Sequence, residues 1–181
     1  METELQLLND VLDGDSGAQR RLYERLAGAA MATALRYVPD HDEVRDVVQE
    51  SFIKILTRIG RFHYRGEGSL RAWAMTIVVH EALNHLRARE HLLLTDRLPD
   101  NVAEEPEPDV ERVPPDVLTR LIGQLPAGYR VVLNLYVFEQ LSHKEIGQLL
   151  GIKPQSSASQ YFRAKQMLAK IIRNYLNDNK Q

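Results

Sequence analysis

The sequence contains no cysteine among its 181 residues. Disulfide bridges, thiolate metal sites and cysteine nucleophiles are therefore excluded, which suits the reducing cytoplasm, where we expect the protein to act. No apolar run approaches the roughly 20 residues that cross a bilayer, and the acidic, amphipathic start METELQLLND is unlike a signal peptide. Alternating strand patterns are missing too, because the β-branched run from Thr76 to Val79 lies within a longer helical period.

Motifs for catalysis and metal binding are equally scarce. The chain has no Gly-rich phosphate loop, no nucleophile elbow and no carboxylate pair placed for acid–base chemistry. The run HEALNH differs from the H-E-x-x-H zinc motif, because Asn84 stands four residues after His80 and His85 lies about 100° further round the helix. We therefore expect no metal site, no cofactor and no enzymatic activity.

The net charge of −2 conceals an uneven distribution. Between Leu92 and Asp116 there are eight acids and two bases, a local balance of −6, which leaves +4 for the remainder. Five prolines fall in the same stretch, and both proline and like-charge repulsion oppose compact structure. Residues 92–114 are accordingly predicted to form a flexible acidic linker between one domain over 1–91 and another over 115–181.

The N-terminal block has helical periodicity almost throughout. Leu5, Leu8 and Leu12 predict a first buried stripe. Three longer helices are predicted over residues 18–37, 42–59 and 70–89, with Ser69 as the N-cap of the last. The apolar positions of the middle one predict its core: Val44, Val47, Val48, Phe52, Ile55 and Ile59.

The segment from Leu141 to Lys170 predicts a helix-turn-helix. Ser142 and Glu145 form a capping-box pattern, Gly151 stands where the chain must reverse, and Pro154 suits the first turn of a second helix. A buried stripe is predicted on that helix at Ser157, Tyr161, Ala164, Leu168 and Ile171. From Gly151 to Asn177 there are five Lys or Arg and no acid, a charge that suits the major groove of DNA.

Two sets of motifs, in order, resemble regions 2 and 4 of bacterial RNA polymerase sigma factors. The first set is Asp46-Val47-Val48-Gln49-Glu50-Ser51-Phe52, Ile59-Gly60-Arg61-Phe62, Ser69-Leu70-Arg71-Ala72-Trp73 and Leu86-Arg87; the second is Leu125-Pro126, Tyr129-Arg130, Leu141-Ser142, Glu145-Ile146, Leu150-Gly151-Ile152 and Arg163-Ala164-Lys165. Two regions with only a short linker are similar to the extracytoplasmic-function group (ECF, group IV). The resemblance implies an all-α protein of two small helical domains: region 2 in 1–91, for polymerase binding and −10 recognition and melting, and region 4 in 115–181, for −35 recognition. It implies an alternative-sigma initiation factor that directs core RNA polymerase to promoters.

The same resemblance implies which residues carry these roles. The D-x-x-Q-E helix would dock on the clamp of the polymerase largest subunit, through Arg45, Asp46, Gln49, Glu50, Ile53 and Lys54. The −10 element would be read by His63, Tyr64, Arg65, Arg71, Trp73, His80, Asn84 and Arg87. The −35 element would be read by Gln155, Ser156, Ser159, Gln160, Phe162, Arg163 and Lys165.

Some positions depart from the family pattern. His80 stands where many relatives carry asparagine, so −10 specificity is not carried over. Ala158 and Gln160 stand where relatives often have basic residues, which predicts weak −35 binding, or recognition through Phe162 and Gln160. The implied partners are core RNA polymerase (clamp and flap), promoter DNA and an anti-sigma factor.

Two alternatives remain at this point. One is a helix-turn-helix regulator whose N-terminal domain senses a ligand or a partner. The other is a helical adaptor, or anti-sigma-like protein, with no role on DNA. The face that carries Asp46, Gln49 and Glu50 separates the sigma-factor hypothesis from both, since only a sigma factor needs it for polymerase capture.

Overall fold

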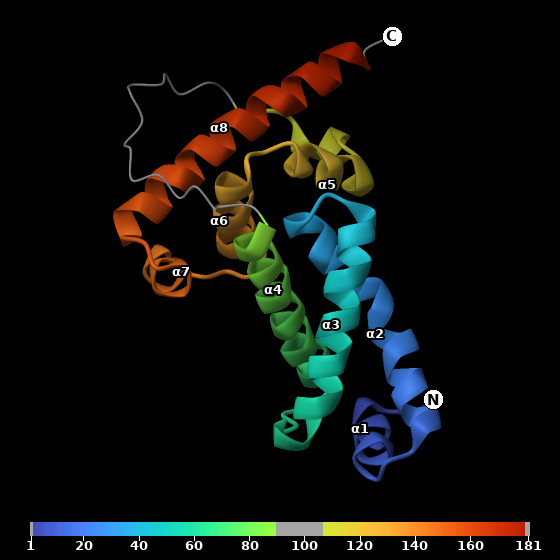
Figure 1. Ribbon diagram of the computed structural model, residues 1–181. Helices are drawn as coiled ribbons and strands as arrows, with labels where there is room; N and C mark the ends of the chain where they lie inside the picture. Colours follow the sequence, from blue (N-terminus) through green and yellow to red (C-terminus); the bar gives the residue numbers. More distant parts are fainter. Residues whose placement is uncertain (1, 90–106, 180–181) are drawn as a thin grey trace. The chain divides into compact units, whose positions relative to one another are not determined.

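The computed structural model describes residues 2–89 and 107–179 (Figure 1). In that part of the chain every regular element is helical: eight α-helices and two short 3₁₀ turns. They fall into two compact units, Met1–His85 and Leu86–Gln181. The predicted all-α class with two small helical domains is confirmed.

The N-terminal unit is built from three long helices and one short one. Its elements are α1 (Glu4–Leu12), α2 (Ser16–Tyr37), α3 (His41–Arg58), the 3₁₀ turn η1 (Ile59–Arg61) and most of α4 (Ser69–Arg89). Helices α2, α3 and α4 run side by side, and α1 packs on α2 (Figure 1). All six apolar positions predicted for the core of α3 are buried. The run from Thr76 to Val79 is helical as predicted; it lies in the middle of α4, with Ile77, Val78 and Val79 buried.

The face that α1 buries differs from the predicted one. Thr3 and Gln6 form a capping box that starts the helix. Leu5 and Leu12 are 42% and 49% exposed, whereas Leu7 and Val11 are buried beside Leu8. Glu4 lies one turn before Leu8 and is buried as well, with 4% of its surface exposed.

The C-terminal unit is organised around its last helix. Its elements are η2 (Val110–Arg112), α5 (Pro115–Gly123), α6 (Ala127–Val137), α7 (His143–Leu150) and α8 (Pro154–Asp178). Helix α8 packs against α5, α6 and α7. Two apolar clusters fill the contacts: Val113, Val117, Leu121 and Ile172 in one, and Ile122, Leu125, Leu133 and Ala164 in the other.

The predicted linker lies only partly within the described residues. Residues 92–106 fall outside them. The remainder includes η2, and Val113, which is 6% exposed, joins the core of the C-terminal unit. Near the end of the predicted linker Val113 is therefore packed, whereas the η2 residues before it are exposed. Along the two described stretches no helix is long and apolar enough to cross a membrane.

Candidate functional site

Helix α3 presents a polar face with one large apolar residue, Ile53, at the C-terminal end of the set. Asp40 caps the helix by accepting hydrogen bonds from the N–H groups of Asp42 and Glu43. Burial of the apolar side leaves a continuous exposed face made of Arg45, Asp46, Gln49, Glu50 and Ile53. Ile53 is 50% exposed, so it offers apolar contact area among the polar side chains of this face. Exposed hydrogen-bonding side chains beside an apolar one provide both kinds of contact that protein interfaces use.

Lys54 differs from the other residues predicted to bind polymerase. Its Nζ lies 2.6 Å from an Oε of Glu81 on α4, and the Glu81 side chain is only 12% exposed. This ion pair joins α3 to α4. A second tie between them joins His85 Nε2 and Glu43 Oε2 at 2.8 Å.

The segment between η1 and α4 carries three of the predicted −10 residues. His63 and Arg65 are exposed, and Tyr64 is partly buried with its hydroxyl 3.5 Å from Glu67. Reduced solvation, together with the negative charges of Glu67 and Glu4, raises the pKa of the Tyr64 hydroxyl. Gly66 and Gly68 have φ of 117° and 88°, values that favour glycine, so the path of this loop depends on them.

Helix α4 brings most of the remaining −10 residues onto one face. His80, Asn84 and Arg87 are exposed and follow one another at spacings of four and three. Trp73 lies two turns before His80 on the same side and is partly buried, with its ring 5.1 Å from that of Phe62. Arg71 is exposed but lies about 180° from His80 by helical geometry, so it belongs to a different surface.

The helix-turn-helix forms as predicted. Ser142 caps α7 in a capping box with Glu145, and these hydrogen bonds lower the pKa of the Glu145 carboxyl. Gly151 ends the helix in the left-handed region at φ 71°, and Pro154 opens α8. A Cβ on Gly147 would lie 2.7 Å from the carbonyl oxygen of Ile152, so the two helices approach too closely there for any side chain.

Three aromatic rings hold the α6, α7 and α8 helices together. His143 stacks on Tyr136 with centroids 4.6 Å apart, and Tyr161 packs on Tyr136 at 4.3 Å. His143 Nδ1 lies 3.0 Å from the hydroxyl of Ser157 on α8. Burial lowers the pKa of His143, so the neutral imidazole is favoured in this position.

The predicted −35 residues of α8 are unequally accessible. Gln155 and Lys165 are exposed, and Ser159, Phe162 and Arg163 are partly buried. Ser156 and Gln160 are buried, with exposed fractions of 8% and 2%.

Gln160, predicted to read the −35 element, lies on the buried side of α8 and not on its exposed face. It follows Ser157 by three residues and precedes Ala164 by four, and both of these are fully buried, so the helix turns it towards them. Neither its amide nitrogen nor its amide oxygen has a hydrogen-bond partner. Ser156 lies one turn earlier on the same side.

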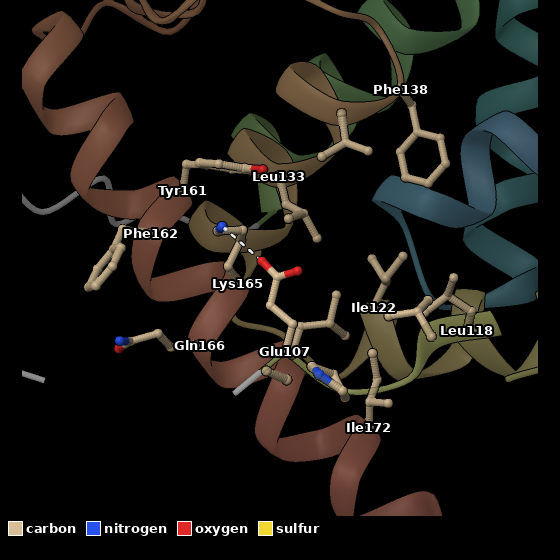
Figure 2. A pocket seen from close by; sticks show the side chains of 15 residues that line it. Glu107, Leu118, Ile122, Leu133, Phe138, Tyr161, Phe162, Lys165, Gln166 and Ile172 are labelled. Atoms are coloured by element: carbon tan, nitrogen blue, oxygen red, sulfur yellow. Dashed lines mark ion pairs between the residues drawn. The ribbon is translucent and has the colours of Figure 1, made fainter. Parts of the chain in front are cut away.

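An apolar cavity of about 470 Å³ lies beside α8. Figure 2 shows its lining, which includes Leu118 and Ile122 of α5, Leu133 of α6 and Ile172 of α8. At its edge Lys165 Nζ lies 3.9 Å from a carboxylate oxygen of Glu107 (Figure 2). Glu107 of the acidic segment therefore lies beside the basic helix.

Comparison with known families identifies these two units. The model of sigma-70 region 2 matches residues 22–91, and that of sigma-70 region 4 matches residues 116–168. The chain belongs to the ECF sigma factors. It is 30% identical to the RNA polymerase sigma-H factor of Pseudomonas aeruginosa, over 98% of this chain and 97% of that one. It is 28% identical to the ECF RNA polymerase sigma-E factor of Haemophilus influenzae, over 92% and 93%.

Among solved structures, the sigma factor RpoE in complex with the anti-sigma factor NepR, from Bartonella quintana, shares the fold. The TM-score is 0.53 at 19% identity, covering 85% of this chain and 96% of that one. The present protein is thus a transcription initiation factor that directs RNA polymerase to promoters. The alternative hypothesis of a separate helix-turn-helix regulator is not favoured.

Sequence reasoning missed several residues that shape the region 2 surface of this sigma factor. Glu4 accepts hydrogen bonds from the start of α4. Glu67 lies in the loop before α4 and pairs with Arg25 of α2. No local pattern could have found them, since their partners lie 42 to 67 residues away in sequence. Helix α1 also lies outside the residues that the region 2 model matches.

Proposed function

We propose that the exposed face of α3 is the surface that binds the clamp of core RNA polymerase. Five of the six residues predicted for this role share the face: Arg45, Asp46, Gln49, Glu50 and Ile53. The observation that supports it best is the half-exposed Ile53 among hydrogen-bonding side chains. Lys54 contributes mainly through its ion pair with Glu81, which holds α3 against α4.

The double variant Gln49→Ala, Glu50→Ala tests this surface. We expect at least a tenfold loss of core polymerase capture in a pull-down, since truncating the few residues that dominate an interface costs about 2 kcal/mol or more each. Arg20→Ala, Glu24→Ala is the matched control, because it removes an exposed ion pair from α2. Equal capture by the wild type and the α3 variant would dismiss the surface.

The second part of the proposal concerns the −10 element. Its opening requires at least one base to leave the stack, at a cost of a few kcal/mol that contacts to that base must offset. The loop residues His63, Tyr64 and Arg65 offer planar groups and positive charge, as single-strand binding requires. Trp73, His80, Asn84 and Arg87 extend this surface along one side of α4, and Arg71 contacts DNA from another side.

The third part concerns the −35 element, which α8 would read in the major groove. Gln155, Ser159, Phe162, Arg163 and Lys165 are the accessible candidates. Ser156 and Gln160 are buried, so they would contact DNA only if the helix exposed them. The few basic groups support weak −35 binding outside the polymerase complex.

Domain limits and partners complete the proposal. We place region 2 in 1–91, the acidic linker in 92–114 and region 4 in 115–181, with region 4 contacting the polymerase flap. An anti-sigma factor is a further partner, as for the Bartonella sigma factor found in complex with one. The factor performs no chemistry itself and acts in the cytoplasm, where polymerase and promoters are found.

A further inference from the structure

We propose that Glu4 of α1 is a positioning residue for the −10 capture loop, defined here as residues 63–68. This inference rests on the proposed role of that loop in −10 recognition. It gives a function to a helix that lies outside the matched region 2 residues, 22–91.

The carboxylate of Glu4 caps α4 from a distance in sequence. Its two oxygens accept hydrogen bonds from the N–H groups of Leu70, at 3.2 Å, and Arg71, at 3.1 Å. These N–H groups belong to the first turn of α4, where the helix offers them no acceptor. A carboxylate is the favoured partner at that end, because the bonds are charge-assisted and the helix dipole is positive there.

Glu4 therefore takes the role predicted for Ser69. The Ser69 hydroxyl instead donates to the carbonyl of Gly66, at 2.6 Å, and accepts from the N–H of Arg65, at 3.1 Å. Ser69 thus closes the loop on itself, and Glu4 fixes where the helix that follows begins.

A second tie joins the same residue to the loop. The backbone N–H of Glu4 donates to a carboxylate oxygen of Glu67, at 3.3 Å. The Tyr64 hydroxyl donates to the same oxygen at 3.5 Å, and the other oxygen of Glu67 pairs with Arg25 of α2 at 2.9 Å. The loop is therefore held at Glu67 by the Glu4 backbone, and the helix that follows it is held at Leu70 by the Glu4 side chain.

These contacts matter because the sequence of the loop alone does not fix its conformation. Two of its six residues are glycines at positive φ, a residue type with many accessible conformations. Ties from α1 and α2 hold His63 and Arg65 outward in one arrangement. A loop ordered before binding loses less conformational entropy when it captures a base, so promoter opening gains from the contact.

The variant Glu4→Gln tests the proposal, since it keeps the size and removes the charge. It also turns an amide NH₂ towards a backbone N–H. In reconstituted holoenzyme we expect about tenfold less opening of the −10 region, equivalent to 1.4 kcal/mol, measured as permanganate reactivity of unpaired thymines. Capture of core polymerase should change less than twofold. Asp13→Asn, an acid-to-amide change at an exposed position next to the end of α1, should leave both measurements unchanged.

Glu67→Gln provides an independent variant, because Glu67 is 60% exposed and its replacement leaves the core intact. It should reduce opening in the same direction but by less, and the double variant should open DNA about as poorly as Glu4→Gln alone. The chain's one tryptophan, Trp73, packs on Phe62 beside the loop, so its emission should shift in Glu4→Gln.

Three results would overturn the inference: wild-type opening by Glu4→Gln, unchanged Trp73 emission, or an equal loss of polymerase capture and opening. The last would assign Glu4 to stability alone. Failure of the proposed function looks different, since the wild-type holoenzyme would then open no promoter, or His63 and Arg65 variants would open it normally.

Discussion

The imidazole of His143 lies among three elements of the C-terminal unit. It stacks on Tyr136 of α6 and approaches Tyr161 and Ser157 of α8. The charged groups around it include Lys144 and Glu145 on its own helix and Lys165 of α8, whose ammonium lies 5.7 Å from the Tyr161 ring centroid. A protonated imidazole would carry its charge into a mostly aromatic setting at the positive end of α7.

Acid should therefore weaken this unit through His143. Burial lowers the pKa of the folded state below the unfolded value of about 6.5. Between the folded and the unfolded pKa of His143, the unfolded state therefore binds more protons than the folded state. The stability that neutral His143 contributes is complete above about pH 6.5, and it is lost as the pH falls from about 6.5 towards the folded pKa. Calorimetry of the full chain should show a falling melting temperature from pH 7 to pH 5.5, which lies above the range where Glu145 titrates.

His143→Asn should flatten that slope, because the amide can still bond to Ser157 but does not titrate. His63→Asn is the matched control, since His63 is exposed on the other unit. A slope in His143→Asn equal to that of the wild type would remove His143 as its source.

At the level of single residues, the sequence predicted which side chains are exposed better than it predicted which side chains form ion pairs. The outward positions of Asp46, Gln49 and Glu50 follow from the apolar pattern of α3, because one helix can bury only one face. The ion pair between Lys54 and Glu81 could not be predicted, since it depends on how α3 and α4 are placed in space. Several side chains could equally have reached Lys54.

At the level of whole helices, the limits of periodicity become visible. In α1, Leu5-Leu8-Leu12 and Leu7-Leu8-Val11 both satisfy spacings of three and four, and packing on α2 selects the second. Capping signals were more reliable when local: the Ser142 capping box of α7 formed as predicted. The cap of α4 did not, because its acceptor comes from another helix.

The close approach of α7 to the start of α8 gives a sharp prediction. Gly147→Ala places a Cβ against the backbone of Ile152, so we expect a loss of about 1–3 kcal/mol in unfolding free energy. Binding of −35 DNA should weaken with it, because the turn sets the angle at which α8 enters the groove. Urea unfolding and duplex binding measure the two effects.

Gly28→Ala is the matched control for that substitution. Gly28 lies in α2 with no atom within 4 Å of its would-be Cβ, so alanine should stabilise the helix by up to about 1 kcal/mol. Equal stability of the two variants would show that the turn relaxes without cost.

For the whole molecule, the separation of charge along the chain is the dominant feature. A stretch with a balance of −6 precedes a helix that carries no acid before Asp178. The contact between Glu107 and Lys165 is 3.9 Å long and well exposed, so as a pair it contributes little to stability. Its significance is electrostatic: negative charge lies beside the surface that would meet the phosphates of DNA.

Removing that charge should let the free factor bind DNA more readily. Glu107→Gln, Asp109→Asn, Glu111→Gln changes the net charge from −2 to +1. At about 50 mM salt we expect several-fold tighter binding to duplexes of any sequence, measured by fluorescence anisotropy. The gain should fade towards 1 M, where the Debye length shrinks to about 3 Å. The triple variant Glu2→Gln, Asp13→Asn, Glu24→Gln makes the same change of charge in the N-terminal unit. An equal gain in duplex affinity with this variant would assign the effect to net charge. A smaller gain would locate the effect at α8.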